Sequence, residues 1–376
     1  MSNKKHYSET DRRRFLLGSA ALLSIGACER KPGVDLGALS QARKLIAARP
    51  SLDLHAHPGK TFVRGAKNLS PALTAFTLSG ANEKKTIRDM AAGGMKTAVF
   101  CAVSDLQVLD FSDSGLVAHR DFNEGEALAS YRTQIEFLNK IFDDGLATKI
   151  LSVTDIKPAS QSPGVNAILG VEGGDFLEGS AERVAEAYAD GVRCINPVHY
   201  RTNEIGDSMT ANPIHEGLTR PGVEVIRAMN ASGIVIDVAH ASERTAFGML
   251  ETSEQPIICS HTHIRTESFD FPRFISLDLA KQISAAGGVI GAWPAGIGIN
   301  NLDGFVDRIF ELVDAVGVEH VGLSTDMDAN YKPVWDNYRQ FPEVVAKMLE
   351  RGLGDNETAK IIGGNGLRVF SHVTGN

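Results

Sequence analysis

The chain has 376 residues, of which 43% are hydrophobic and 22% are charged, and its formal net charge is −8. This is enough apolar material for one large core, and single α/β barrels commonly have this length. The body of the chain contains no block of basic residues. Composition therefore argues against nucleic acid as a partner.

The N-terminal segment 1–28 differs in kind from the rest. Three consecutive arginines at 12–14 precede a short apolar stretch over 15–27, which is typical of a twin-arginine export signal. The stretch is too short to cross a bilayer comfortably, so export is favoured over a transmembrane anchor. Small residues before Cys28 resemble a bacterial lipoprotein cleavage site, with an ordinary signal peptide as the alternative. We therefore expect a periplasmic or cell-envelope protein, anchored by a lipid on Cys28.

Residues 29–50 are expected to form a linker and a leading helix, and residues 51–376 one domain. Besides Cys28 the chain has Cys101, Cys194 and Cys259, each within an apolar run. These three have no Cys-x-x-Cys spacing, so they are poor zinc ligands. We expect buried thiols rather than disulfides.

Eight short runs rich in Val, Ile, Leu and Ala recur over 51–376 and predict strands buried on both faces of a parallel sheet. Amphipathic helical patterns lie between them, most clearly at 180–190, 222–232, 242–251, 278–286 and 302–316. Eight β/α repeats predict a closed (β/α)8 TIM-type barrel rather than an open sheet. The predicted strands are Ser51–His57, Lys96–Val103, Ala167–Glu172, Val192–His199, Gly233–His240, Pro256–His261, Gly288–Pro294 and His320–Asp326.

Histidines and acids stand at or just after the ends of several of these strands. A barrel builds its active site at the C-terminal ends of its strands, and imidazole and carboxylate groups gathered there are ligands of catalytic metals. This pattern predicts a metal-dependent hydrolase. The residues that form it are His55, His57, Glu172, His199, His240, His261 and Asp326.

His55 and His57 are the strongest local signal. Residues i and i+2 of a strand point to the same face, so this His-x-His directs two imidazoles to one point. His240 and His261 each place an imidazole at the end of an apolar strand, which suits zinc. Glu172 lies beside glycines, which allow close approach, and its two oxygens are suited to bridge two ions.

The residues alone leave the role of His199 open. It is either a metal ligand or a donor to the substrate carbonyl. His263 is a weaker alternative to His261, because it lies two residues further along the chain.

Two further choices concern the acid and the substrate. Asp326 is preferred over Asp328 as the group that takes and returns a proton, because it is the first acid after its strand. Arg265 and Arg273 both follow the sixth strand, and either guanidinium matches the geometry of a substrate carboxylate.

Several segments carry a family resemblance that is specific in their order and spacing, although each is weak alone. They are Asp53–His57, Gly170–Gly174, Val198-His199, Gly217–Thr219, Asp237–Ser242, Ser260-His261, Pro272-Arg273, Gly322–Asp328 and Gly363–Val369. Through them nearly all of the chain from Leu52 to Val369 resembles the membrane (renal-type) dipeptidases, peptidase family M19 of the amidohydrolase-like barrels.

This resemblance implies a site for two zinc ions. His55 and His57 would hold one ion, His240 and His261 the other, and Glu172 would bridge them. A hydroxide between the ions would attack the peptide carbonyl of a dipeptide.

The resemblance also implies roles for three other residues. Asp326 would carry the proton to the leaving amine. His199 would steady the carbonyl oxygen or the tetrahedral intermediate. Arg273, rather than Arg265, would bind the C-terminal carboxylate of the dipeptide.

The sequence departs from the family pattern in two places. The family usually has His-x-Asp where this chain has His55-Ala56-His57, and commonly Asn where this chain has Phe274. The imidazole of His57 removes one negative charge, so substrate identity is the least constrained feature.

A zinc-dependent dipeptidase is the expected function. The alternative is a related binuclear metal amidohydrolase acting on another small amide or lactam, and a non-enzymatic envelope lipoprotein is a third hypothesis. A homodimer is compatible with the sequence.

Overall fold

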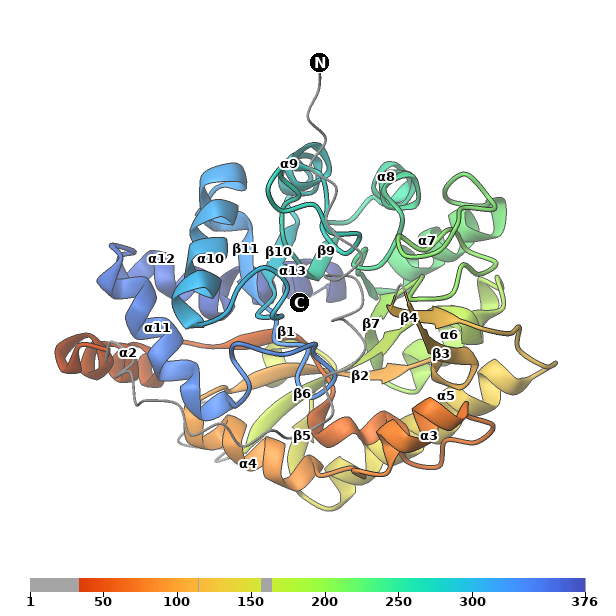
Figure 1. The fold of residues 1–376 in the computed structure, drawn as a ribbon, viewed down its shortest axis with the longest axis horizontal. Coiled ribbons are helices and arrows are strands. Elements are labelled where there is room, and N and C mark those ends of the chain that lie inside the picture. The colour runs from red at the N-terminus through yellow and green to blue at the C-terminus, as the bar shows by residue number, and fades with distance from the viewer. Residues whose placement is uncertain (1–33, 114, 157–163, 376) are drawn as a thin grey trace.

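The computed structural model describes residues 34–113, 115–156 and 164–375 (Figure 1). The predicted export signal at 1–28, including Cys28, lies outside the described residues. Within the described ranges, no helix combines the length and the apolar character needed to cross a membrane.

Parallel strands form the wall of a nearly closed (β/α)8 barrel, in the order β8-β7-β6-β2-β1-β11-β10-β9. Val238 donates its backbone N–H to the carbonyl of Ile258 at 2.8 Å and thereby joins the two end strands. All the predicted strands are present, although their ends differ by a few residues. Their bounds are β1 Leu52–Ala56, β2 Thr97–Val103, β6 Val165–Glu172, β7 Val192–Asn196, β8 Val235–Ile236, β9 Ile258–Thr262, β10 Val289–Ala292 and β11 Val321–Leu323.

Three short strands were not predicted. β5 (Ala147–Lys149) pairs in parallel with the first three residues of β6. β3 (Leu109–Ser112) and β4 (Gly115–Ala118) form an antiparallel hairpin between β2 and the next helix.

Helices follow the strands and surround the barrel (Figure 1). The predicted leading helix is α2, and the five clearest helical patterns correspond to α6, α7, α8, α9 and α10. The helices are α2 Leu36–Ala48, α3 Pro71–Thr77, α4 Glu83–Gly93, α5 Glu126–Asp143, α6 Glu182–Ala189, α7 Arg220–Ser232, α8 Glu243–Thr252, α9 Leu277–Ala285, α10 Leu302–Val316, α11 Phe341–Glu350, α12 Asp355–Ala359 and α13 Asn365–Thr374.

Local sequence sets where several of these helices begin and end. The side chains of Thr219, Ser242, Ser276 and Asn301 each accept a backbone N–H in the first turn of the helix that follows. Such caps satisfy donors that have no partner within the helix. Helix α7 ends at Gly233, whose φ of 76° lies in the left-handed region that glycine adopts without strain.

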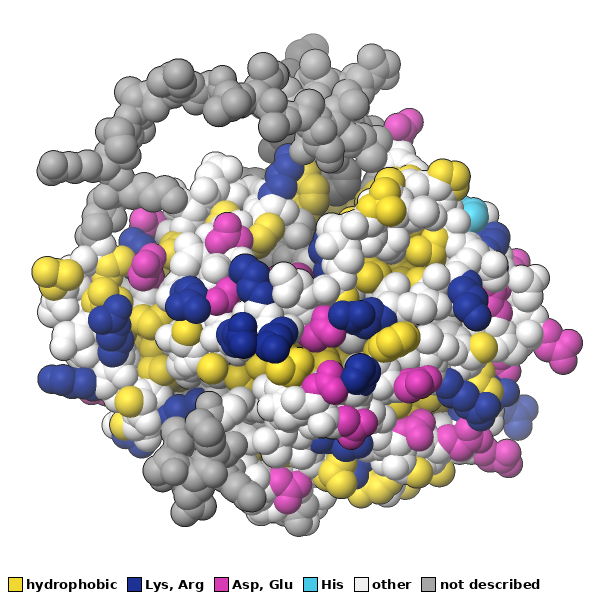
Figure 2. Space-filling view, turned by 90° about the horizontal axis from the view of Figure 1, so that it is seen from below, with side chains coloured by type: hydrophobic (Ala, Val, Ile, Leu, Met, Phe, Trp, Pro, Cys, Tyr) yellow, Lys and Arg dark blue, Asp and Glu magenta, His cyan; other side chains and the backbone are white. Residues whose placement is uncertain are grey.

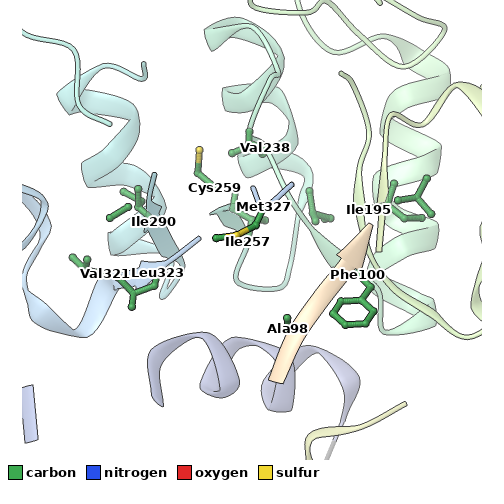
Figure 3. Packing of buried hydrophobic residues seen from close by; sticks show 14 of the residues in the cluster. Ala98, Phe100, Ile195, Val238, Ile257, Cys259, Ile290, Val321, Leu323 and Met327 are labelled. Carbon is green, nitrogen blue, oxygen red and sulfur yellow. The ribbon is translucent and has the colours of Figure 1, made fainter. Parts of the chain in front are cut away.

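The strand β2 shows how the core is divided into two layers. Ala98 and Phe100 pack outward with the residues of the helices (Figure 3). Val99 and Cys101 belong to the separate cluster inside the barrel. This alternation follows from the two-residue period of a strand. Inside the barrel, Phe370 and other apolar residues of α13 close the end that lies away from the strands' C-termini.

Cys101, Cys194 and Cys259 are buried free thiols, as predicted. Cys101 and Cys194 belong to the cluster inside the barrel, and Cys259 belongs to the outer layer. On the face shown in Figure 2, Lys and Arg side chains lie interspersed with Asp and Glu.

Candidate metal centre

The structure brings the predicted site residues together around the carboxylate of Glu172, at the C-terminal end of the barrel. Glu172 is the last residue of β6 and is 3% exposed. Imidazole Nε2 atoms approach both of its oxygens. The distances to Oε1 are 3.4 Å from His55, 2.9 Å from His240 and 3.5 Å from His261, and those to Oε2 are 3.3 Å from both His57 and His199.

Four of these imidazoles face one another in two pairs. The Nε2 atoms of His55 and His57 are 3.1 Å apart, and those of His240 and His261 are 2.9 Å apart. Each pair forms, with Glu172, a group of potential ligand atoms lying within 4.8 Å of one another. These are the two ligand sets that the family resemblance implied.

A hydrogen bond behind His57 favours a proton on its Nδ1, the tautomer whose Nε2 can bind a metal ion. Nδ1 of His57 lies 3.0 Å from the carbonyl oxygen of Cys101, which only accepts, so Nδ1 carries the proton and Nε2 presents its lone pair. Nδ1 of His261 lies 2.8 Å from the hydroxyl of Ser260. Such outer hydrogen bonds orient metal-binding imidazoles. The donor set therefore fits divalent metal ions.

The electrostatics of the cluster agree with this interpretation. Burial disfavours the charged form of His57, but Asp326 and Glu172 raise its pKa to about 10, so without a cation in the site Nε2 carries a proton that a metal ion would have to displace. Burial and the nearby Arg273 guanidinium hold the pKa of His240 well below its usual value. His240 is thus neutral at neutral pH, which is the form that binds metal.

Two site residues end short strands with an unusual backbone conformation. His240 follows β8 with a φ of 77°, and Asp326 follows β11 with a φ of 53°. Left-handed backbone is uncommon for residues other than glycine and is frequent at functional sites. At these positions the strand ends bend and the side chains reach the cluster.

Asp326, rather than Asp328, faces the histidines. Oδ1 of Asp326 lies 3.4 Å from Nε2 of His57. Asp328 instead accepts the backbone N–H of Gly59 at 2.6 Å and the hydroxyl of Thr86 at 2.5 Å. Among these two acids, only Asp326 is positioned to exchange a proton inside the site.

Arg273 reaches the cluster, whereas Arg265 does not. Nη2 of Arg273 lies 2.8 Å from Nε2 of His240, and its guanidinium lies 5.3 Å from the ring centroid of Trp293. Within the described part of the chain, Nε of Arg273 has no hydrogen-bond partner. Arg265 donates to the carbonyl of Phe274 at 2.8 Å. Arg273 therefore keeps donor capacity for a ligand at the mouth of the site.

His263, the weaker alternative to His261, is buried outside the group around Glu172. Its ring packs edge-on against Phe274, with the centroids 5.3 Å apart. Burial lowers its pKa to about 3, which keeps it neutral.

A cavity of about 540 Å³ adjoins the centre, between the β3–β4 hairpin and the loop after β7. Tyr200 lines it, together with Val117, Arg120 and Thr210. The ring of Tyr200 also lies 4.5 Å from that of His199, centroid to centroid. None of the candidate metal ligands lines this cavity, and Tyr200 connects it to the centre through its contact with His199.

Two buried carboxylates that stand behind the histidines were not predicted from the sequence. Oδ1 of Asp105 lies 2.6 Å from Nδ1 of His199. Oδ2 of Asp237 lies 3.9 Å from Nδ1 of His55. Asp105 comes two residues after β2, so the rule that strand ends carry function would have included it.

The barrel and the ligand cluster at its mouth define the class of protein, a (β/α)8 barrel of the metal-dependent hydrolase type. The family profile of membrane dipeptidases (peptidase family M19) matches residues 39–376. The chain belongs to this family, as its motifs predicted.

Two relatives with sequences similar to this chain are also named as dipeptidases. Dipeptidase verJ of Clonostachys rogersoniana is 29% identical over 260 residues, which are 66% of this chain and 66% of that protein. Dipeptidase tcpJ of Claviceps purpurea is 29% identical over 274 residues, covering 67% of this chain and 63% of that protein. The matched region thus spans about two thirds of the length of these relatives.

Solved structures share the fold. The probable dipeptidase PvdM from Pseudomonas aeruginosa has a TM-score of 0.75 and 18% identity, covering 90% of this chain and 99% of that one. A metallo peptidase from Rhodobacter sphaeroides, liganded with a phosphinate mimic of the dipeptide L-Ala-D-Ala, has a TM-score of 0.72 and 16% identity. It covers 86% of this chain and 99% of that one.

Proposed function

We propose that the protein is a zinc-dependent dipeptidase with two ions per chain. The observation that carries this proposal is the convergence of two imidazole pairs on one carboxylate in a member of the membrane dipeptidase family. When bound, such ions polarise the scissile carbonyl and lower the pKa of a water molecule enough for attack at neutral pH.

Arg273 binds the carboxylate at the C-terminus of the dipeptide in this proposal. Its guanidinium is buried at the edge of the centre, and it borders the imidazole of His240. A planar fork of donors matches a carboxylate and fixes the orientation of the substrate. This contact favours substrates with a free C-terminus within one residue of the scissile bond.

His199 and Asp326 handle charge and protons. His199 donates from Nε2 to the oxygen that becomes negative as the carbonyl is attacked. Asp326 accepts a proton from the attacking water and returns it to the leaving amine, the exchange expected of a general acid–base group. Asp326 is 8% exposed, so bulk water does not compete freely for that proton.

The test is turnover of a matched panel by the purified, zinc-loaded enzyme. The panel holds L,L- and L,D-dipeptides, the same dipeptides with an amidated C-terminus, and small lactams. The phosphinate mimic of L-Ala-D-Ala bound by the Rhodobacter sphaeroides relative is a reason to include the L,D series. We expect hydrolysis of free dipeptides and poor hydrolysis of their amides. Turnover of lactams or other amides alone would favour the related amidohydrolase instead.

We further propose that the protein is exported through its twin-arginine signal and anchored to the cell envelope by a lipid on Cys28. The support is the arginine run at 12–14 and the short apolar stretch before Cys28. Replacing Arg12 and Arg13 by Lys should leave active enzyme in the cytoplasm. Recovery of that variant in the envelope would contradict the export route.

A further inference from the structure

Asp237 is a buried carboxylate behind the candidate metal ligands, and its Oδ1 stabilises the local backbone. Oδ1 accepts the backbone N–H of Ala239 at 3.0 Å and that of Ser260 at 2.9 Å. These two bonds connect the chain after β8 to β9. The next residues are His240 and His261, so this oxygen ties together the two segments that carry the second pair of ligands.

The other oxygen of Asp237 is different. The side chain is fully buried, and Oδ2 has no hydrogen-bond partner among the residues the structure describes. Leaving a carboxylate oxygen buried and unpaired is costly, and such groups are rare in native structures.

A second buried aspartate shows the usual situation. Asp53 is also fully buried. Its Oδ1 accepts from the backbone N–H groups of His55 and Thr325, and its Oδ2 accepts the hydroxyls of Thr325 and Tyr338. Both oxygens of Asp53 are therefore satisfied without any ligand. Oδ2 of Asp237 has no such hydrogen bond among the described residues, which indicates that it serves another group.

The imidazole of His55 faces this oxygen, with its Nδ1 3.9 Å from Oδ2. His55 points its Nε2 at Glu172 and His57. To bind a cation through Nε2, a neutral imidazole must carry its proton on Nδ1, and that proton needs an acceptor. Cys101 Sγ lies closer, at 3.4 Å from Nδ1, but a thiol sulfur is a weak acceptor beside a carboxylate.

We propose that Asp237 is a positioning residue that accepts the Nδ1 proton of His55 and thereby presents Nε2 to the first metal ion. Through its other oxygen the same carboxylate fixes the segments that carry His240 and His261. One buried side chain thus coordinates the placement of ligands for both ions. This inference rests on the proposed two-zinc function.

The test is zinc affinity of the full-length protein, measured by competition with a chromophoric chelator, for wild type and three variants. Asp237→Asn retains an oxygen for the two backbone bonds but removes the charge facing His55. We expect it to weaken one zinc site about 10- to 100-fold, the usual effect of losing an outer hydrogen-bond partner. Cys101→Ala removes the competing acceptor, and Asp105→Asn removes a carboxylate behind a different histidine. Both should keep wild-type zinc affinity.

Three outcomes would overturn the inference while leaving the proposed function intact. In the first, the Asp237→Asn variant would bind zinc as tightly as wild type. In the second, the Cys101→Ala variant would bind zinc more weakly and Asp237→Asn would not. In the third, Asp237→Asn would bind one zinc ion fewer than wild type at saturating zinc. The third would make Asp237 a direct ligand. Wild type that binds no zinc would overturn the inference together with the proposed function.

A measurement on wild type keeps the test independent of how well Asp237→Asn folds. Nitrogen-15 NMR of the zinc-loaded protein should show His55 protonated on Nδ1, with a proton that exchanges slowly with water. Loss of that slow proton in Asp237→Asn, but not in Cys101→Ala, would identify the carboxylate as its acceptor. An unprotonated Nδ1 in wild type would contradict the inference.

Discussion

Nδ1 of His199 and Oδ1 of Asp105 lie 2.6 Å apart, and the second oxygen of Asp105 accepts the backbone N–H groups of Tyr200 and Arg201. The carboxylate is fully buried, so it fixes the imidazole in one orientation, with Nε2 3.3 Å from Glu172. Burial disfavours the charged form of His199, but the carboxylates of Asp105 and Glu172 outweigh this effect, so the pKa of His199 is raised above its usual value. His199 is therefore suited to donate a proton or hydrogen bond rather than to bind a metal ion.

Asp105→Asn should lower kcat about 100-fold, the effect typical of weakening one donor to a developing oxyanion. KM and zinc content should stay close to wild type, because the residue touches neither substrate nor metal ligand directly. Affinity for a phosphinate dipeptide, which mimics the tetrahedral intermediate, should fall in parallel with kcat. Steady-state kinetics and inhibition constants check this. A variant that lost zinc instead would place His199 among the ligands.

The fold was predictable from sequence because parallel barrel strands are buried on both faces and are therefore continuous apolar runs. The β3–β4 hairpin was missed because its strands are short and partly exposed. The strand at 233–240 proved to be only β8, Val235–Ile236. Its end bends at His240, and a local pattern does not reveal backbone with positive φ at a histidine.

The candidate metal ligands could be identified from sequence because each stands at or just after a strand end, where residue type and position carry the signal together. Asp105 and Asp237 were harder to identify. Their significance lies in contacts with His199 and His55, 94 and about 180 positions away in the chain respectively. The strand-end rule could have included Asp105, but the histidine that each carboxylate contacts becomes visible only when the barrel brings distant strands side by side.

Glu172→Gln should reduce zinc from two ions per chain to one or fewer and abolish dipeptide hydrolysis. A neutral amide cannot supply two anionic oxygens to two cations. Asp328→Asn is the matched control, because Asp328 bonds to Gly59 and Thr86 rather than to the histidines. Elemental analysis of both proteins gives the comparison. Two ions retained in Glu172→Gln would refute a bridging role.

Arg273→Lys should raise KM for free dipeptides about 10- to 100-fold, with a smaller change in kcat, because a single ammonium replaces a two-pronged contact to the carboxylate. Hydrolysis of C-terminally amidated dipeptides should change little. Arg265→Lys serves as control, since Arg265 is bonded to the carbonyl of Phe274. Equal effects of the two substitutions would mean that Arg273 does not select the substrate.

Stability at acid pH should depend on Glu126. The Arg120 guanidinium, 2.7 Å away, lowers the pKa of this carboxyl to about 2. Because the folded-state pKa lies below the usual value, the pair stabilises the protein above pH 4.5, and this contribution fades as pH falls toward 2.

Glu126→Gln removes the titrating group and should cost about 1 kcal/mol near pH 7, as expected for a partly exposed ion pair. The difference from wild type should shrink steadily as the pH falls below 4.5 and nearly vanish near pH 2. Denaturant unfolding at several pH values measures it. A difference that is constant across this range would show that the ion pair does not couple stability to pH.

We propose that one two-zinc centre is assembled by His55, His57, Glu172, His240 and His261. Zinc content per chain of the purified full-length protein, measured by elemental analysis alongside hydrolysis of the dipeptide panel, tests it most directly. A two-zinc centre predicts close to two zinc ions per chain together with turnover of free dipeptides. One ion or none, without dipeptide turnover, would contradict it and would mean that His57 has changed both the centre and its substrate.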